Sequence, residues 1–154
     1  MIVGVISDTH GLLRPEALEA LRGSEHIIHA GDIGAPEIIA ELQKIAPVTA
    51  IRGNVDVQTW AREFPETEVV ELGGKSIYVI HDVKALDLNP KAAGFCAVIS
   101  GHSHKSGQET KNGVLFLNPG SAGPRRFNLP ISMANLSIEE SGLRAEIVVL
   151  SIPR

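Results

Sequence analysis

The first third of the chain alternates between apolar runs and segments with helical spacing. Residues 2–7 (IVGVIS), 26–29 (HIIH) and 47–51 (PVTAI) are apolar runs typical of strands that are buried on both faces. A proline begins each intervening segment, which predicts one helix over about 15–22 and another from Pro36 onward. This order of strands and helices predicts a parallel sheet with helices packed on it.

The remainder of the chain is richer in short strands. Gly73-Gly74 and Asn112-Gly113 are signals for hairpin turns, and a further turn is expected near 140–142. We expect this part to be antiparallel and to form a second sheet, and two sheets packed face to face with helices outside would bury both sets of apolar runs. The fold class is therefore α/β, in a single domain over 1–154. The expected strands are 67–72, 75–80, 96–100, 106–111, 114–118, 131–138 and 143–150.

The composition narrows the classes of partner. Hydrophobic residues make up 44% and charged residues 21%, and no stretch approaches the roughly 20 apolar residues of a membrane span. We see no secretory signal, and the single Cys96 cannot form an internal disulfide, so we expect a cytoplasmic protein without a membrane partner. The net charge of −4 argues against a nucleic-acid partner, yet bound metals would add the positive charge that a small phosphate substrate needs.

Side chains that can bind metal follow five of the predicted strands, at the point where each strand ends. Because ligand sites in parallel sheets form beyond the carboxyl ends of strands, we expect these side chains to gather at one edge. Glycines 31, 53 and 101 precede three of them and allow tight turns there. The residues are Asp8, His10, Asp32, Asn54, His81, His102 and His104.

The chemistry of this set fits a pair of divalent metals, because histidine and carboxylate are common ligands of Mn, Fe, Zn, Co and Ni. Asp8 and His10 are two positions apart, as are His102 and His104, so each pair can point to one side of an extended segment. Each motif alone has a simpler explanation, since Gly-Asp and Gly-Asn are usually turns and a lone histidine can belong to the core. The ordered combination predicts metal binding, whereas the two histidines of 26–29 are expected to be structural.

The motifs D-x-H, G-D, G-N-x-D, a lone His and G-H-x-H occur in that order and resemble those of the calcineurin-like metallophosphoesterase superfamily. Segments 52–56 (RGNVD) and 118–121 (NPGS) resemble its small bacterial and archaeal phosphodiesterase branch. The resemblance implies the metallo-dependent phosphatase fold, a four-layer αββα sandwich of two mixed sheets. It also implies two divalent ions per chain, with Mn preferred and Fe, Ni, Zn or Co as alternatives. One ion would be held by Asp8, His10, Asp32 and His104, with Asp32 bridging to a second ion completed by Asn54, His81 and His102.

The expected function is hydrolysis of phosphodiester bonds in small substrates, nucleotides included, by a hydroxide that bridges the two metals. We expect Asp32, Asn54 and His102 to serve catalysis as well as metal binding, and Asn54 and Arg125 to contact the substrate phosphate. In larger members of the superfamily a histidine that assists the leaving group follows the asparagine. Here that position is Val55, which cannot donate a proton, so we expect weaker activity on poor leaving groups.

Two other functions stay open. The first is a protein-binding scaffold without turnover, for which the retromer subunit that resembles this branch is a precedent, although that subunit lacks part of the ligand set that is complete here. The second is a nuclease, which the acidic net charge disfavours. The branch also suggests a dimer or tetramer. Of the remaining polar residues, Asp56 is expected to orient a metal-binding histidine, Asp82 to narrow the site or bind a neighbour, and Arg125 or Arg126 to lie at the solvated surface.

Overall fold

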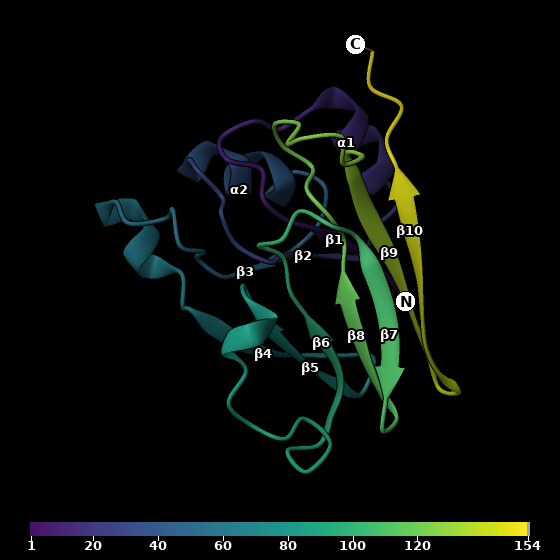
Figure 1. Cartoon of the computed structure of the whole chain (residues 1–154). Coiled ribbons are helices and arrows are strands. Elements are labelled where there is room, and N and C mark those ends of the chain that lie inside the picture. Colours follow the sequence, from purple (N-terminus) through teal and green to yellow (C-terminus); the bar gives the residue numbers. More distant parts are fainter. Residues whose placement is uncertain (154) are drawn as a thin grey trace.

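Residues 1–153, which the computed structural model describes, form two five-stranded sheets (Figure 1). Sheet A has the strand order β10-β9-β1-β2-β3, and sheet B has the order β4-β5-β6-β8-β7. No helix among these residues is long and apolar enough to span a membrane. In chain order the elements are β1 (Ile2–Ile6), α1 (Pro15–Leu21), β2 (His26–His29), α2 (Pro36–Gln43), β3 (Val48–Ala50), η1 (Thr59–Glu63), β4 (Thr67–Leu72), β5 (Lys75–Ile80), η2 (Val83–Ala85), β6 (Phe95–Ile99), β7 (Gly107–Lys111), β8 (Val114–Asn118), β9 (Ser132–Glu139) and β10 (Gly142–Val149).

The predicted elements are found within about a residue of their expected bounds, but the expected division of the strands between the sheets was wrong. Strand β9 pairs antiparallel with β1, and β10 pairs with β9, so the last two strands belong to sheet A. Sheet B is mixed, because β6 pairs parallel with both β5 and β8. Residues 132–134 of β9 and Leu136 are buried, which shows that this strand, between β10 and β1, is covered on both faces over that stretch.

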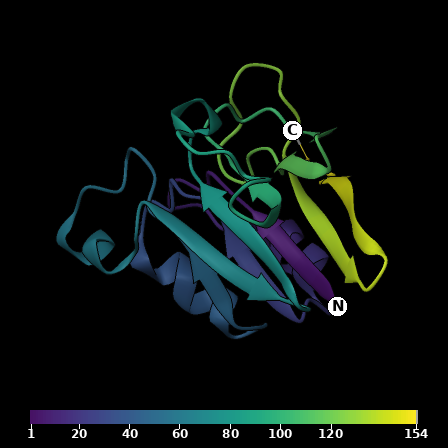
Figure 2. The same ribbon diagram turned by 90° about the horizontal axis from the view of Figure 1, so that it is seen from below.

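Three apolar clusters hold the layers together, in the order of the α/β sandwich. Figure 1 shows α1 and α2 on one side of sheet A and sheet B on the other, and Figure 2 shows the teal strands of sheet B lying over the purple β1. One cluster fills the space between the sheets and includes Val5, Ile77 and Ile99. A second joins the helices to sheet A, and a third covers the outer face of sheet B, where the layer consists only of η2 and neighbouring loops.

His29, at the end of β2, is fully buried and ties together the loops that follow β1 and β2. Its Nδ1 accepts the backbone N–H of Gly31 (3.1 Å), so the proton of the neutral ring lies on Nε2 and is donated to Thr9 Oγ1 (3.0 Å). The Thr9 hydroxyl in turn donates to the Ile33 carbonyl (2.8 Å). Burial lowers the pKa of His29 to about 3, so the ring is neutral at physiological pH.

Replacing His29 with glutamine should flatten the pH dependence of stability. The unfolded histidine titrates near 6.5 and the folded one near 3, so the unfolded state takes up the proton first and wild-type stability falls as the pH drops below 6.5. The difference between these two pKa values lowers the free energy of unfolding of the wild type by about 2 kcal/mol as the pH falls from 7 to 5. Urea denaturation of both proteins at a series of pH values, with a chelator present, measures it. Parallel pH profiles would contradict the prediction.

Candidate metal centre

The loops that carry the predicted ligands lie side by side at the carboxyl ends of β1, β2, β3, β5 and β6. The backbone N–H of His10 donates to the Asp32 carbonyl (2.9 Å), which joins the loops after β1 and β2. The N–H of Gly101 donates to the His81 carbonyl (2.9 Å), which joins the loops after β5 and β6. The two sheets therefore present their ligand-bearing loops to a common site, as the strand order predicts.

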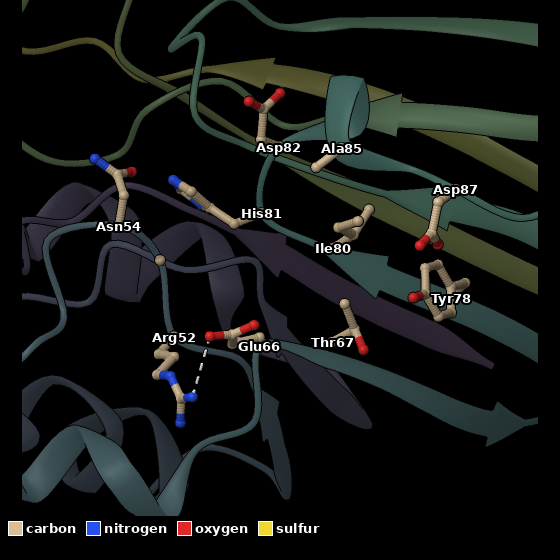
Figure 3. A pocket seen from close by; sticks show the side chains of 11 residues that line it. Arg52, Asn54, Glu66, Thr67, Tyr78, Ile80, His81, Asp82, Ala85 and Asp87 are labelled. Carbon is tan, nitrogen blue, oxygen red and sulfur yellow. Dashed lines mark hydrogen bonds and ion pairs between the residues drawn. The ribbon is translucent and has the colours of Figure 1, made fainter.

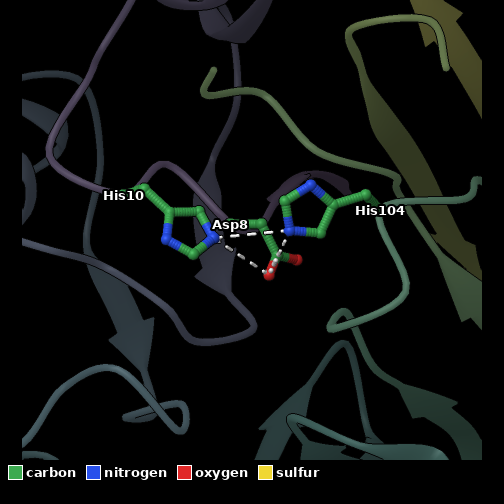
Figure 4. Close-up of side chains that lie close together, drawn as sticks. All are labelled: Asp8, His10 and His104. Atoms are coloured by element: carbon green, nitrogen blue, oxygen red, sulfur yellow. Dashed lines mark hydrogen bonds and ion pairs between the residues drawn. The ribbon is translucent and has the colours of Figure 1, made fainter. Parts of the chain in front are cut away.

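A first group of ligands consists of Asp8, His10 and His104, whose coordinating atoms lie within 4.8 Å of one another (Figure 4). Asp8 Oδ1 lies 3.4 Å from His104 Nε2 and 3.8 Å from His10 Nε2, and the two histidine nitrogens are 3.3 Å apart. Asp8 Oδ1 is buried and accepts no hydrogen bond within residues 1–153. A buried carboxylate oxygen surrounded by imidazole nitrogens needs a positive partner, which a bound cation supplies.

A second group consists of Asp32, His81 and His102, with Asn54 beside it. Asp32 Oδ2 lies 3.1 Å from His81 Nε2 and also 3.6 Å from His10 Nε2, which places this oxygen between the two groups. Ligands about 2.1 Å from a metal are separated by roughly 3.0–3.4 Å in octahedral or tetrahedral geometry. Several of the observed spacings lie in or near that range, so the residues fit two divalent ions.

Asn54 lies within reach of the second group. Its side-chain amide is 3.3 Å from His102 Nδ1, 3.1 Å from His81 Nε2 and 3.2 Å from Asp32 Oδ2. An amide offers both an oxygen, which can bind a cation, and an NH₂ group, which can donate a hydrogen bond.

The backbone of the ligand loops is held in a conformation that most residues avoid. The φ angle is positive at five of the seven predicted ligands, namely Asp8, His10, Asp32, His102 and His104. Non-glycine residues in this left-handed region cost of order 1–3 kcal/mol each and persist only where the surrounding structure enforces them. Such a concentration of strain in one set of loops marks a site that is built for function rather than for stability.

Glycine is required before two of these ligands because other elements approach its Cα. A Cβ at Gly101 would lie 2.6 Å from Asp8 Oδ2 and still closer to Ser7 Oγ. A Cβ at Gly53 would overlap both the backbone and the carboxylate of Asp32. The absence of side chains at these two glycines therefore allows the loops from different strands to bring their ligands together.

Asp56 has a different role from the one expected. This buried carboxylate does not contact a histidine but accepts three backbone N–H groups, from Ile33 and Gly53 on Oδ2 and from Gly34 on Oδ1, each at 2.9 Å. It therefore holds the loop after β2 against the loop after β3, and so fixes Asp32 relative to Asn54. The G-N-x-D motif includes Asp56, but the sequence pattern does not show that its carboxylate accepts backbone N–H groups of two loops.

One supporting residue was not identified from the sequence. Ser7 Oγ donates to Asp8 Oδ2 (2.7 Å), and the backbone N–H of His102 donates to the same oxygen (3.1 Å). Asn118, in the segment 118–121 that resembles the branch, lies at the end of β8 and donates its amide to the Gly101 carbonyl (2.9 Å) and to Ser103 Oγ (3.2 Å). Both side chains orient the ligand loops, and for Ser7 only its position next to Asp8 could have indicated this role.

The two carboxylates of the site differ in their proton affinity. Burial raises the pKa of Asp8 to about 6, because the hydrogen bond from Ser7 and the nearby His81 only partly offset desolvation. Burial also raises the pKa of Asp32, but hydrogen bonds from His81 and the Val55 N–H outweigh that effect and bring the value to about 2. The pKa of His81 is raised despite burial, because it contacts Asp32 and the Ala30 carbonyl. Asp32 is thus the permanently negative group of the site.

Asp82 and Arg126 lie near the predicted ligands, and Arg125 lies at the surface. Arg125 is exposed, and its side chain makes no hydrogen bond or ion pair within residues 1–153. Burial, together with the positive charge of Arg126, lowers the pKa of His104 to about 4, so the charge of Arg126 acts on a predicted ligand. Asp82 Oδ2 lies 3.8 Å from His102 Nε2, so this carboxylate neighbours a ligand as expected.

The chain matches a protein family and a curated protein over most of its length. The model of the calcineurin-like phosphoesterase superfamily domain matches residues 1–141. A probable metallophosphoesterase of Methanothermobacter thermautotrophicus is 35% identical over 165 aligned positions, which cover 99% of this chain and 95% of that protein.

Solved structures of two kinds share the fold. One is described as a novel archaeal phosphodiesterase, with a TM-score of 0.78 at 25% identity, covering 96% of this chain and 100% of that one. Another is Vps29 of Entamoeba histolytica in complex with Zn²⁺, with a TM-score of 0.74 at 26% identity, covering 97% of this chain and 99% of that one.

Replacing Asp56 with asparagine should destabilise the protein by about 2–4 kcal/mol, because one of its two acceptor atoms becomes an NH₂ group facing backbone N–H donors. Urea denaturation measures the loss of stability. Asp87→Asn, the same chemical change at an exposed residue, serves as control and should alter stability by less than about 0.5 kcal/mol. Equal effects of the two substitutions would show that Asp56 does not hold the loops.

Proposed function

Because this chain belongs to the calcineurin-like phosphoesterase superfamily, we propose that it hydrolyses phosphodiester bonds of small substrates at a centre of two divalent metal ions. The observation that carries the proposal is the buried Asp8 Oδ1, which lacks a hydrogen-bond partner and lies near nitrogens of His10, His81 and His104. The second ligand group adjoins it through Asp32. All seven expected ligands lie in or beside these groups.

Each ligand has a defined part in this proposal. Asp8, His10 and His104 would hold one ion, and His81, His102 and Asn54 would hold the other, with Asp32 placed between the two groups. Bound divalent ions activate water and neutralise charge on phosphate oxygens. Two such ions against Asp8 and Asp32 leave a local charge of +2 (4 − 2), which attracts an anionic diester in spite of the net charge of −4.

Substrate approaches from the side of Asn54 and His102, since these ligands are exposed whereas Asp8, Asp32, His81 and His104 are buried. We propose that the Asn54 amide oxygen would bind an ion and that its NH₂ group would donate to a phosphate oxygen. His102 would bind the same ion on the open side of the site, so both residues would act where the phosphate reacts. Arg125 stays a candidate for contact with a distal part of the substrate.

The absence of a proton donor at position 55 limits the range of leaving groups. Val55 is partly exposed and gives only its backbone N–H to the site, which it donates to Asp32 Oδ1 (3.1 Å). The leaving alcohol must then take its proton from solvent. Diesters of acidic alcohols are therefore the substrates that we propose, with Mn²⁺ as the preferred ion and the cytoplasm as the location. Assembly as a dimer or tetramer remains a prediction.

A scaffold without turnover is the second candidate, because the fold is shared with Vps29. Fold similarity alone does not separate the two functions. The complete ligand set favours the hydrolase, and measurement of turnover decides between them.

Metal binding should stabilise the protein strongly. Titration of metal-stripped protein with Mn²⁺ in a calorimeter should give two ions per chain, and free Mn²⁺ at 100 times its Kd should add about 2.7 kcal/mol to the free energy of unfolding per site. Asp8→Asn should weaken one of the two sites, whereas His26→Gln, which changes a histidine outside the site, should leave both unchanged. Fewer than two ions bound to the wild type would contradict a dinuclear centre.

The metal-stripped protein should hydrolyse bis-p-nitrophenyl phosphate only when Mn²⁺ is added, and should cleave p-nitrophenyl phosphate less efficiently. Asp32→Ala and His102→Ala should each reduce kcat/KM at least about 100-fold, since even residues that merely orient a metal ligand are worth 10–100-fold. The His26→Gln protein is again the control. Two bound ions without turnover of any diester would favour the scaffold.

A further inference from the structure

A pocket of about 470 Å³ opens directly beside the metal centre, on the outer face of sheet B (Figure 3). Asn54 and His81 line one end of it, and Tyr78 and Asp87 lie at the other. A substrate phosphate bound at the metals would thus have one of its two ester groups at the mouth of this pocket. The volume is in the range of ordinary small-molecule sites.

The charges that line the pocket do not balance. Arg52 is paired with Glu66 (3.2 Å) and also donates to the Phe64 carbonyl (2.8 Å), so these two charges cancel. Asp82 lies 3.8 Å from His102 Nε2 and accepts the Lys84 backbone N–H (3.0 Å), whereas no side-chain hydrogen bond or ion pair of Asp87 is formed within residues 1–153. Neither aspartate is paired with a lysine or arginine that lines the pocket. The pocket is therefore negative, next to a metal centre that is positive.

Tyr78 adds a polar group to the pocket wall. Its ring packs against Phe95, with the ring centroids 5.1 Å apart, and the side chain belongs to the cluster that covers the outer face of sheet B. Only 9% of the residue is exposed, and the residue lines the pocket. Its hydroxyl makes no hydrogen bond within residues 1–153 and is not a buried atom, so it is open to the pocket and free to bond a ligand there.

We propose that this pocket binds one alcohol group of the phosphodiester, and that it selects alcohols carrying hydroxyl or ammonium donors over alcohols carrying a second anion. The proposal rests on the hydrolytic function proposed above, because the metals fix the phosphate at the pocket mouth. Donors on the alcohol bind Asp82, Asp87 and the Tyr78 hydroxyl oxygen, whereas a carboxylate or second phosphate on the alcohol is repelled by the two aspartates.

Three chromogenic diesters test this selectivity. Each has p-nitrophenol as one alcohol, and the second alcohol is ethanolamine, glycerol or glycolate, which differ mainly in charge. For the Mn²⁺-loaded wild type, kcat/KM should be at least about 10-fold higher for the ethanolamine and glycerol esters than for the glycolate ester. A preference for the glycolate ester would overturn the proposal.

Variants locate the source of the preference. Asp87→Asn should reduce it by about 3- to 10-fold, mainly through KM, and Asp87→Lys should reverse it. Tyr78→Phe, which removes only the hydroxyl, should lower kcat/KM for the glycerol ester by about 3- to 10-fold relative to kcat/KM for bis-p-nitrophenyl phosphate. Glu140→Gln removes one negative charge from an exposed turn, as Asp87→Asn does from the pocket, and should leave the preference unchanged. A preference that is the same in the Asp87 variants and the wild type would overturn the proposal.

Binding separates this proposal from the hydrolytic one. Calorimetric titration of the Mn²⁺-loaded protein with phosphoethanolamine and phosphoglycolate measures the pocket without turnover, and Asp87→Lys should shift the ratio of the two affinities toward phosphoglycolate. If no diester is hydrolysed but this shift occurs, the hydrolase fails and the pocket stands. If diesters are hydrolysed but neither the rates nor the affinities respond to position 87, the pocket assignment fails and the hydrolase stands.

Discussion

Two buried carboxylates, Asp8 and Asp32, impose the constraint around which the site is built. Each has one oxygen held by donors of the protein and one oxygen left for the centre of the site. Asp8 Oδ2 accepts from Ser7 Oγ and the His102 N–H, and Asp32 Oδ1 accepts from the Val55 N–H. The other oxygens face histidine nitrogens. Burial of two like charges is unfavourable without a cation. The fold holds the carboxylates in place by hydrogen bonds, and the proposed metal ions would neutralise them.

The rest of the molecule supplies the rigidity that this arrangement needs. The positive φ angles of the ligand loops are unfavourable locally, and the apolar clusters on both faces of sheet A and both faces of sheet B hold the strands to which the loops are attached. His29 and Asp56 transmit this rigidity by bonding to loop backbone. The packed layers stabilise the fold, and the ligand loops at the edge shared by the two sheets carry the unfavourable backbone conformations.

The sequence predicted the elements well because its local signals were strong. Apolar runs, the Gly73-Gly74 turn and prolines at helix starts mark the observed boundaries, and the strand ends placed the ligands together. Partners far apart in the chain were not predictable in this way. That β9 lies next to β1, that Asp56 binds backbone N–H groups, and that the Tyr78 hydroxyl reaches a pocket depend on tertiary packing, which no periodicity records.

The thin layer outside sheet B has a consequence for how such a protein can diversify. The connection between β5 and β6 begins at His81 and, after that one ligand, supplies Asp82 beside His102, one wall of the pocket and apolar contacts to the outer face of the sheet. The other predicted ligands are attached to different loops. Changes in residues 82–94 would therefore reshape one side of the pocket while six of the seven predicted ligands keep their loops.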